Sequence, residues 1–308
     1  MIEVIDFEPD HIECQEHERF IYLYDSTYHH SRGIACIVAS PKRHRAKNKL
    51  IVLVHGSLSH KNAIYQPLLA HCLAELGYHS LRLDFRGLGD SEDVRDPKLG
   101  RTIEEDIHDI KTVYKATQEA QICANLFETE SITFHAIVGH SRGVLAMFDF
   151  ALSIAPSIIP ILVNCSGRFD GQGLLKRCSE NNPNWIEKGG FYATTLRQGK
   201  LQKIWIPKEE SFSVIRTNTL NYRNLSHDTT VISIYGTNDE VVPPMEASLD
   251  YSSVFKDHHQ LIYIDGAGHN FYGKLGEQNT RGLPLRRGMI NYNHELVEYL
   301  QDIFTKSV

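Results

Sequence analysis

A serine lies between two glycines where a strand-like segment meets a helix-like one. Gly139-His140-Ser141-Arg142-Gly143 follows the apolar run 132–138 and precedes the helical pattern 144–153. In such a turn, the glycines let strand and helix approach a sharply turned serine, whose hydroxyl then projects from the sheet edge. Amides at the start of the helix also point at negative charge forming there. We therefore predict Ser141 as a nucleophile; the alternative is a glycine-rich turn with an idle serine.

That serine needs a general base, because its hydroxyl is a poor nucleophile at neutral pH. We expect the base to be His269, which follows the last predicted strand in the glycine-rich segment 265–268. The orienting carboxylate is predicted at Asp239, in the loop after the apolar run 231–235. The order serine, aspartate, histidine is the one that this strand–helix topology imposes. Two neighbouring acids are alternatives to Asp239: Glu240 and Asp265.

Two backbone N–H groups should hold the oxyanion that forms during attack. One belongs to the residue after the nucleophile, Arg142, and the other to Ser57, in the loop that leaves the run 50–54. We expect His55 to be structural, because its neighbour's amide serves the chemistry. The glycine-containing segment Asp84–Ser91 lacks the third glycine of a dinucleotide loop and is predicted to border the pocket.

These residues need a sheet that brings their loops to one edge. Segments 19–26 and 33–40 alternate apolar and polar residues, as antiparallel strands do. Helical patterns cover 64–76, 103–114 and 296–304, and Thr102 fits an N-cap. Short apolar runs predict six buried parallel strands: 50–54, 81–85, 132–138, 158–163, 231–235 and 261–264. We expect an α/β fold with about eight strands, mostly parallel and flanked by helices.

Residues 166–230 form a connection far longer than is usual between a strand and a helix. We expect a small cap, 171–228, inserted after the sixth strand into a core made of 1–170 and 229–308. Its aromatic residues are predicted to bind substrate in an apolar pocket with few charges, unless they only pack the cap itself. They are Trp185, Phe191, Tyr192 and Trp205.

Composition narrows the classes of partner. The chain has 308 residues, 42% of them hydrophobic, enough for one large core. Its net charge of −6 gives no reason to expect nucleic acid or an anionic membrane as a partner. Without a signal-like start in 1–10 or a run long enough for stable membrane insertion, we expect a cytoplasmic protein. The six cysteines and 17 histidines lack metal-site spacing, so we expect free thiols and neither metal nor cofactor.

From about Leu50 onward the chain resembles the α/β-hydrolase superfamily. Within it, the chain is most similar to the feruloyl (cinnamoyl) esterase-like branch, including uncharacterised intracellular fungal members. It departs from that branch at Ser57, where an aromatic residue is often found, and at Arg142, where glutamine is common. Five segments carry the resemblance: His55-Gly56-Ser57, Asp84–Ser91, Gly139–Gly143, Gly236–Pro243 and Gly268–Phe271.

The function expected from these features is hydrolysis of a small-molecule carboxylic ester through an acyl-enzyme. Aryl or short-to-medium acyl esters should be preferred to long lipid chains or charged phosphoesters. A first alternative uses the same three residues on a thioester or an amide, or for acyl transfer. A second is a non-catalytic binding protein on the same fold, which is disfavoured because all three catalytic positions are filled.

Overall fold

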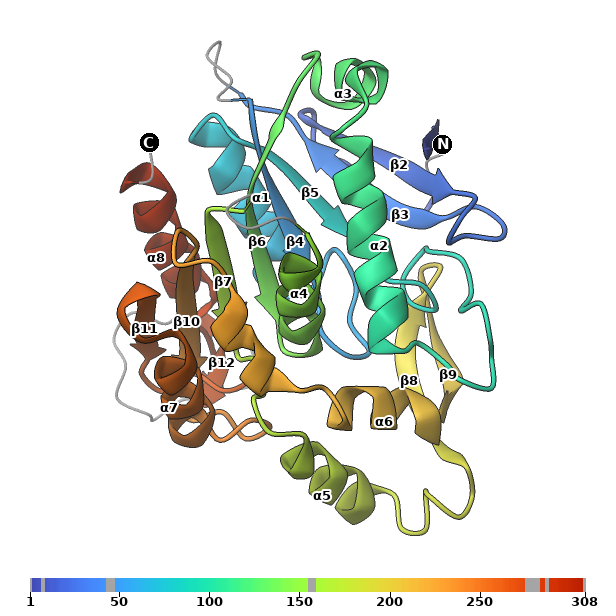
Figure 1. Ribbon diagram of the computed structural model, residues 1–308, viewed down its shortest axis with the longest axis vertical. Coiled ribbons are helices and arrows are strands. Elements are labelled where there is room, and N and C mark those ends of the chain that lie inside the picture. Colours follow the sequence, from blue (N-terminus) through green and yellow to red (C-terminus); the bar gives the residue numbers. More distant parts are fainter. Residues whose placement is uncertain are drawn as a thin grey trace.

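A computed structural model describes residues 2–6, 9–42, 48–154, 159–274, 283–285 and 288–306. In these residues a nine-stranded sheet has the order β1-β2-β3-β5-β4-β6-β7-β10-β11. The first three strands are antiparallel, and the other six run parallel to one another (Figure 1). The strands are β1 (Ile2–Ile5), β2 (Glu18–Asp25), β3 (Ile34–Ala39), β4 (Lys49–Val54), β5 (His79–Leu83), β6 (Thr133–His140), β7 (Ile161–Cys165), β10 (Thr230–Gly236) and β11 (His259–Ile264). The expected mostly parallel sheet is confirmed.

The sheet has one strand more than the eight expected. The additional strand, β1, pairs antiparallel with β2 at the edge of the sheet, with Ile2 opposite Asp25 and Ile5 opposite Tyr22. Of its four residues only Ile2 is buried. Such a short segment has too little alternation for the sequence pattern to identify it.

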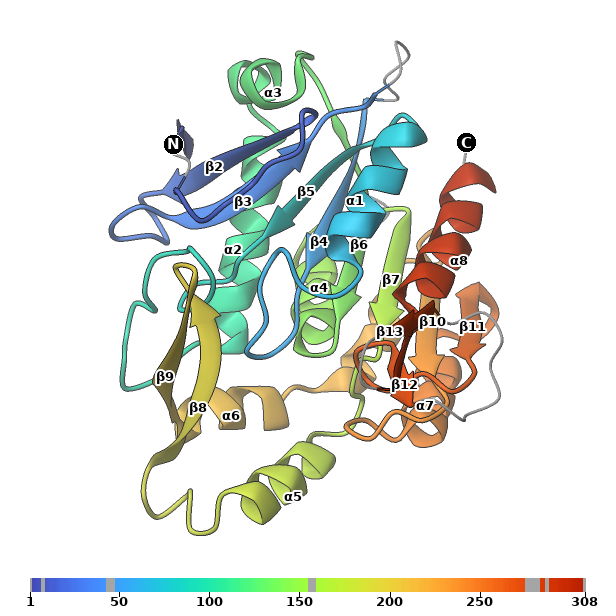
Figure 2. The same ribbon diagram turned by 180° about the vertical axis from the view of Figure 1, so that it is seen from behind.

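Helices cover both faces of the sheet. One face carries α1 and α8, and the other carries α2, α3, α4 and α7 (Figures 1 and 2). Their bounds are α1 (Gln66–Glu75), α2 (Ile103–Ala116), α3 (Ala120–Phe127), α4 (Arg142–Ser153), α7 (Pro244–Phe255) and α8 (Asn293–Lys306). At the start of α2, the Thr102 side chain accepts a hydrogen bond from the Glu105 amide, as the capping pattern predicts.

The two helical layers explain why the parallel strands are apolar throughout. Along β4, Leu50, Val52 and Val54 pack into the core beneath α2 and α4. Ile51 and Leu53, which point the other way, pack into the core beneath α1 and α8. Successive strand residues face opposite sides, so a strand covered on both sides must be apolar at every position.

The long connection after β7 folds at the C-terminal ends of the parallel strands (Figure 1). Its hairpin turns at Gln198 and Gly199, both with positive φ, and touches the core where the Thr195 hydroxyl donates to the Leu58 carbonyl. Tyr222 packs on Phe148 of α4 in the main core. The elements are α5 (Gly171–Asn181), β8 (Gly190–Arg197), β9 (Lys200–Pro207), α6 (Lys208–Ile215) and the 3₁₀ helix η1 (Thr219–Asn224). The term cap is kept for residues 171–228.

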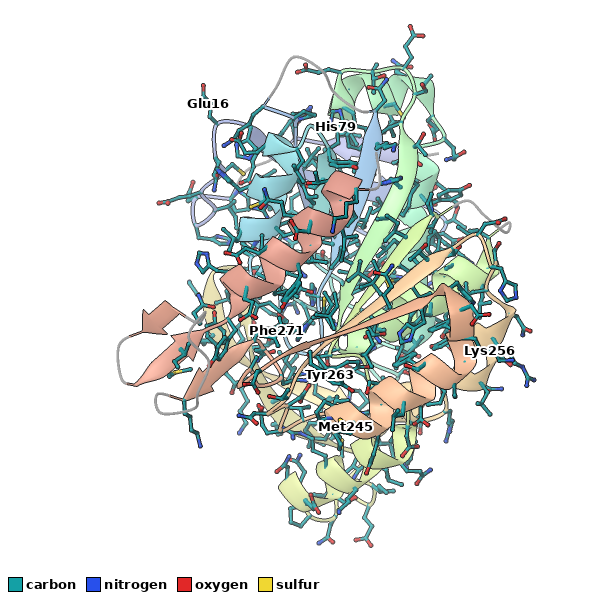
Figure 3. The ribbon with its side chains drawn as sticks, turned by 90° about the vertical axis from the view of Figure 1, so that its left-hand side faces the viewer. Glu16, His79, Met245, Lys256, Tyr263 and Phe271 are labelled. Carbon is teal, nitrogen blue, oxygen red and sulfur yellow. The ribbon has the colours of Figure 1, made fainter. Side chains whose placement is uncertain are left out.

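The last part of the chain begins with α7, which packs on β10 and β11. Figure 3 labels Met245 near the start of α7 and Lys256 directly after its end. The helix packs on β11 through a 2.5 Å hydrogen bond between the hydroxyls of Ser248 and Tyr263. Phe271, also labelled, is fully buried. The remaining elements are η2 (Lys256–His258), β12 (Tyr272–Lys274), β13 (Leu283–Leu285) and β14 (Met289–Asn291). In the described part of the chain, every helix is too short or too polar to cross a membrane.

Candidate active site

Ser141 occupies a strained turn between β6 and α4. Its backbone has φ 51° and ψ −117°, a conformation that residues other than glycine rarely adopt. The Ser141 amide donates to the Cys165 carbonyl at the end of β7, which holds the turn against the sheet. The strand–turn–helix predicted around this serine is therefore present.

Two glycines allow the close packing that this turn requires. A Cβ atom on Gly56 would lie 3.0 Å from the Cβ of Ser141, so a larger residue would push the loop after β4 away from the serine. A Cβ atom on Gly143 would lie 2.6 Å from the His55 carbonyl oxygen, too close for any side chain. The serine, the first turn of α4 and the loop after β4 are therefore in direct contact.

His269 lies between the serine and a carboxylate. Its Nε2 is 3.0 Å from Ser141 Oγ, and its Nδ1 is 2.9 Å from Asp239 Oδ2. The Asp239 side chain is fully buried, and its Oδ1 accepts hydrogen bonds from the amides of Val241 and Val242, each 2.8 Å long. With Nδ1–H donated to the carboxylate, Nε2 is free to accept the serine proton.

The two alternative carboxylates lie elsewhere. Glu240 Oε2 accepts a hydrogen bond from the His269 backbone amide, so it holds the loop and not the imidazole. Asp265 is exposed, and its Oδ1 accepts a hydrogen bond from the Thr237 hydroxyl. In this geometry only Asp239 can orient the His269 ring.

Two buried histidines near the site are held neutral. The His55 Nε2 accepts a hydrogen bond from the Phe85 amide and its Nδ1 donates to the Gly56 carbonyl, which fixes the tautomer. Burial, and then the charge of Arg101, lower the pKa of His55 well below its usual value. Burial, followed by the proximity of His269, does the same to the pKa of His140. Neither ring can take the place of His269 as the base for Ser141.

The two predicted oxyanion donors flank the serine. Arg142 is the first residue of α4, where amides have no partner within the helix. Ser57 follows Gly56, whose backbone abuts the Ser141 side chain. Both residues also line a neighbouring cavity of about 440 Å³. Two amides at these positions can face an oxygen bound next to Ser141 Oγ.

The Arg142 side chain makes contacts that the sequence did not predict. Its Nε is 2.9 Å from Asp106 of α2, and its Nη1 is 3.0 Å from Glu210 of α6, in the cap. Its Nη2 donates to the Arg101 carbonyl. Arg142 thus joins the nucleophile turn to α2 and to the cap.

The cavity lies between the C-terminal end of the sheet and the cap. Ser141 and His269 do not line it, whereas Ser57 and Arg142, the two predicted oxyanion donors, do. Segment 84–91, which was predicted to border the pocket, contributes Arg86, Gly87 and Leu88 to the cavity wall.

Only two of the four cap aromatic residues predicted to bind substrate line the cavity, namely Phe191 and Trp205. Trp185 is buried in the cap itself, against Phe212, so it packs the cap core. Tyr192 is 58% exposed and lies outside the cavity, although Trp205, its cross-strand neighbour, lines it. The cavity lining therefore does not include these two residues.

The expectation that the pocket has few charged residues is wrong. Apolar side chains such as Leu88, Val94 and Ile206 share the cavity wall with seven charged residues. These are Arg86, Asp93, Arg101, Arg142, Arg177, Arg197 and Glu210. They come from segments far apart in the sequence, so no local pattern indicates that they share a wall.

Among the described residues, no three or more histidine, cysteine, aspartate or glutamate side chains are grouped as metal ligands. The groups that the described site offers for chemistry are the Ser141 hydroxyl, the His269 imidazole, the Asp239 carboxylate and the neighbouring backbone amides.

Known proteins resemble the chain in sequence and in fold. The uncharacterized protein YDL057W of Saccharomyces cerevisiae is 41% identical over 314 residues, covering 96% of this chain and 95% of that protein. Est1E from Butyrivibrio proteoclasticus, in a structure with ferulic acid bound, has a TM-score of 0.61 at 17% identity, covering 89% of this chain and 94% of that one. A monoacylglycerol lipase from Paleococcus ferrophilus has a TM-score of 0.60 at 16% identity, with coverages of 89% and 99%.

These two solved structures share the fold, and the sequence itself assigns the family. Residues 51–274, which include Ser141, Asp239 and His269, match the alpha/beta hydrolase family. The chain belongs to the alpha/beta hydrolase family.

Proposed function

We propose that this protein is a serine hydrolase that cleaves carboxylic esters through an acyl-enzyme. The observation that carries the proposal is the hydrogen-bonded series of Ser141, His269 and Asp239, with successive distances of 3.0 and 2.9 Å. An unreactive serine would not need a strained backbone, an imidazole on its hydroxyl and a buried carboxylate behind that imidazole.

Each residue has a defined part in the reaction. His269 Nε2 takes the proton as Ser141 Oγ attacks the ester carbonyl, and the amides of Ser57 and Arg142 hold the resulting oxyanion. The imidazolium, stabilised by Asp239, then gives this proton to the departing alcohol oxygen. Water, activated by the same imidazole, attacks the acyl-enzyme, and the serine regains its proton as the acid leaves.

The cavity supports a compact substrate. Its volume of about 440 Å³ lies in the range of small-molecule sites. Phe191 and Trp205 provide aromatic surface, which suits an aryl group or a short-to-medium acyl chain. The solved structures of similar fold include an Est1E structure with ferulic acid bound and a monoacylglycerol lipase, so the fold accommodates ester chemistry in related proteins.

A fluorophosphonate probe tests whether the site is catalytic. The expected result is a single covalent adduct, located on Ser141 by peptide mapping. The purified protein should also hydrolyse p-nitrophenyl esters in a series from acetate to palmitate, together with methyl ferulate, with the best kcat/KM on short, medium or aryl acyl groups. Absence of the adduct would overturn the enzyme assignment and favour a binding protein.

A matched panel separates the ester hydrolase from the other uses of the same site. Butyryl esters, thioesters and anilides of similar size should be compared by kcat/KM. We expect the ester to be turned over best. A labelled Ser141 combined with turnover of the thioester or amide alone would contradict the ester assignment and retain the nucleophile.

A further inference from the structure

Arg101 is a buried cation in the cavity wall that the proposed reaction does not use. It lies in the loop before α2, is 3% exposed and lines the cavity together with Ser57 and Arg142. Its Nε is 3.0 Å from Asp106 Oδ1. The other oxygen of Asp106 accepts a hydrogen bond from Arg142, so the two guanidinium groups share one carboxylate.

The end of the Arg101 guanidinium lacks hydrogen-bond partners. Within the described residues, neither Nη1 nor Nη2 has an acceptor, although both atoms are buried. The group lies 5.1 Å from the centre of the Phe85 ring, which provides a face but no acceptor oxygen. Buried donors of this kind are costly unless they are satisfied, and the described residues supply no acceptor for these two nitrogens.

Burial and the neighbouring Arg142 lower the pKa of Arg101 to about 10. The group still carries its charge at neutral pH. Arg101 is therefore a buried, poorly hydrated cation, and it shares the Asp106 carboxylate with Arg142.

Other arginines of the cavity wall already have partners. Arg86 is bonded to Asp109 and to the carbonyls of Tyr28 and Glu105. Arg197 pairs with Asp93. Asp109, which pairs with Arg86, and Asp106, which pairs with Arg142, are absent from the cavity lining. The cavity lining thus contains five arginines and only two acids, Asp93 and Glu210.

We propose that the cavity takes a carboxylic ester that also bears a free carboxylate, and that Arg101 binds this carboxylate through Nη1 and Nη2. The proposal rests on the proposed function, since it names the substrate class of the same site. The guanidinium offers two parallel donors, which match the two oxygens of a carboxylate, and a charge-assisted bond is strengthened where water is excluded. The apolar side chains of the cavity would hold the carbon chain between the ester and the carboxylate.

A pair of substrates of equal shape tests the proposal on the unmodified protein. The mono-p-nitrophenyl ester of adipic acid carries a terminal carboxylate, and p-nitrophenyl 6-methylheptanoate has an isopropyl group in its place. We expect kcat/KM to be about 10- to 100-fold higher for the adipate ester. Equal values, or a preference for the neutral ester, would overturn the proposal and leave the hydrolase assignment intact.

Arg101→Gln should remove this preference by lowering kcat/KM for the adipate ester about 10- to 100-fold. The neutral ester should change less than about threefold. Arg101→Lys, which keeps the charge but not the fork, should fall between the two. An equal loss on both esters would show that Arg101 serves the reaction centre or the fold, and would overturn its role in carboxylate recognition.

Binding can be measured without turnover. In the Ser141→Ala variant, methyl hydrogen adipate should bind in isothermal titration calorimetry, and adding Arg101→Gln should weaken its Kd about 10-fold or more. Thermal unfolding checks that both variants fold. If the double variant does not fold, the comparison of kcat/KM for the two esters on the unmodified protein remains the test of the proposal. Arg101-dependent binding by a protein that hydrolyses no ester would support the carboxylate site and overturn the proposed function. Binding of inorganic phosphate but not of the adipate ester would overturn the carboxylate assignment.

Discussion

Two neighbouring regions of the site are built in different ways. The catalytic edge consists of the loops after β6, β10 and β11, and each loop contributes one residue: Ser141, Asp239 and His269. The charged wall includes Arg101, Arg142 and Glu210, which come from a loop, a helix start and the cap. Each residue of the edge lies in its own local motif, whereas the contacts of Arg142 with Asp106 and with Glu210 join segments of the wall that are distant in sequence. The edge should therefore govern chemistry, and the wall should govern selectivity and stability.

Ser141→Ala should have the largest effect, because it removes the nucleophile while the fold loses only a hydroxyl. We expect kcat for p-nitrophenyl butyrate to fall on the order of 10⁶-fold, and fluorophosphonate labelling to disappear. Ser253→Ala is a matched control, since its exposed hydroxyl bonds only within α7. Retained labelling of the Ser141 variant would remove this serine from the catalytic edge.

Asp239→Asn comes next. The amide can no longer hold Nδ1–H of His269 as a carboxylate does, so kcat should fall by roughly 10³- to 10⁴-fold with little change in substrate binding. Asp265→Asn, one strand away and exposed, should have almost no effect on either constant. If the Asp265 variant lost activity and the Asp239 variant did not, the carboxylate would be wrongly assigned.

Arg142→Gln separates the two roles of one residue. The backbone amide stays, so kcat for a small neutral ester should fall far less than in Asp239→Asn. The side-chain contacts with Asp106 and Glu210 weaken, and breaking a buried ion pair should lower the free energy of unfolding by about 3 kcal/mol. Urea unfolding and steady-state kinetics measure the two effects. Unchanged stability with a large loss of kcat would place the side chain at the reaction centre instead.

The smallest effect concerns two adjacent residues of β8. Phe191→Ala removes part of the cavity wall and should lower kcat/KM for methyl ferulate about 10-fold. Tyr192→Ala removes an exposed ring outside the cavity and should leave kcat/KM unchanged. Equal losses would mean that the cap is placed differently over the site when substrate is bound.

What the sequence could predict follows from the same contrast. The strands, the helix starts and the loops that carry Ser141, Asp239 and His269 could be predicted, since a buried strand followed by a glycine-containing loop is a local pattern. The importance of Arg101 could not be predicted, because it depends on the Asp106 carboxylate that Arg101 shares with Arg142 and on its place in the cavity wall. The number of charges facing the cavity was misjudged for the same reason.

The cap hairpin was missed although a local signal existed. Residues 190–197 and 200–207 are joined by Gln198-Gly199, a two-residue connection with positive φ at both positions. Glycine in such a connection is typical of a β-hairpin. The separation of Phe191 from Tyr192 and the burial of Trp185 could not be predicted, because they depend on which face of this hairpin meets the core.

The ion pair between Arg142 and Glu210 gives the cap a mechanical link to the reaction centre. Any outward swing of α6 that admits a bulky ligand must break this pair, and Arg142 is also the residue whose amide is to face the oxyanion. The cap is therefore tied to the residue after the candidate nucleophile by one side-chain ion pair. An outward movement of α6 would have an electrostatic cost besides the loss of packing, while the contacts of Arg142 with Asp106 and with the Arg101 carbonyl would still hold the serine turn.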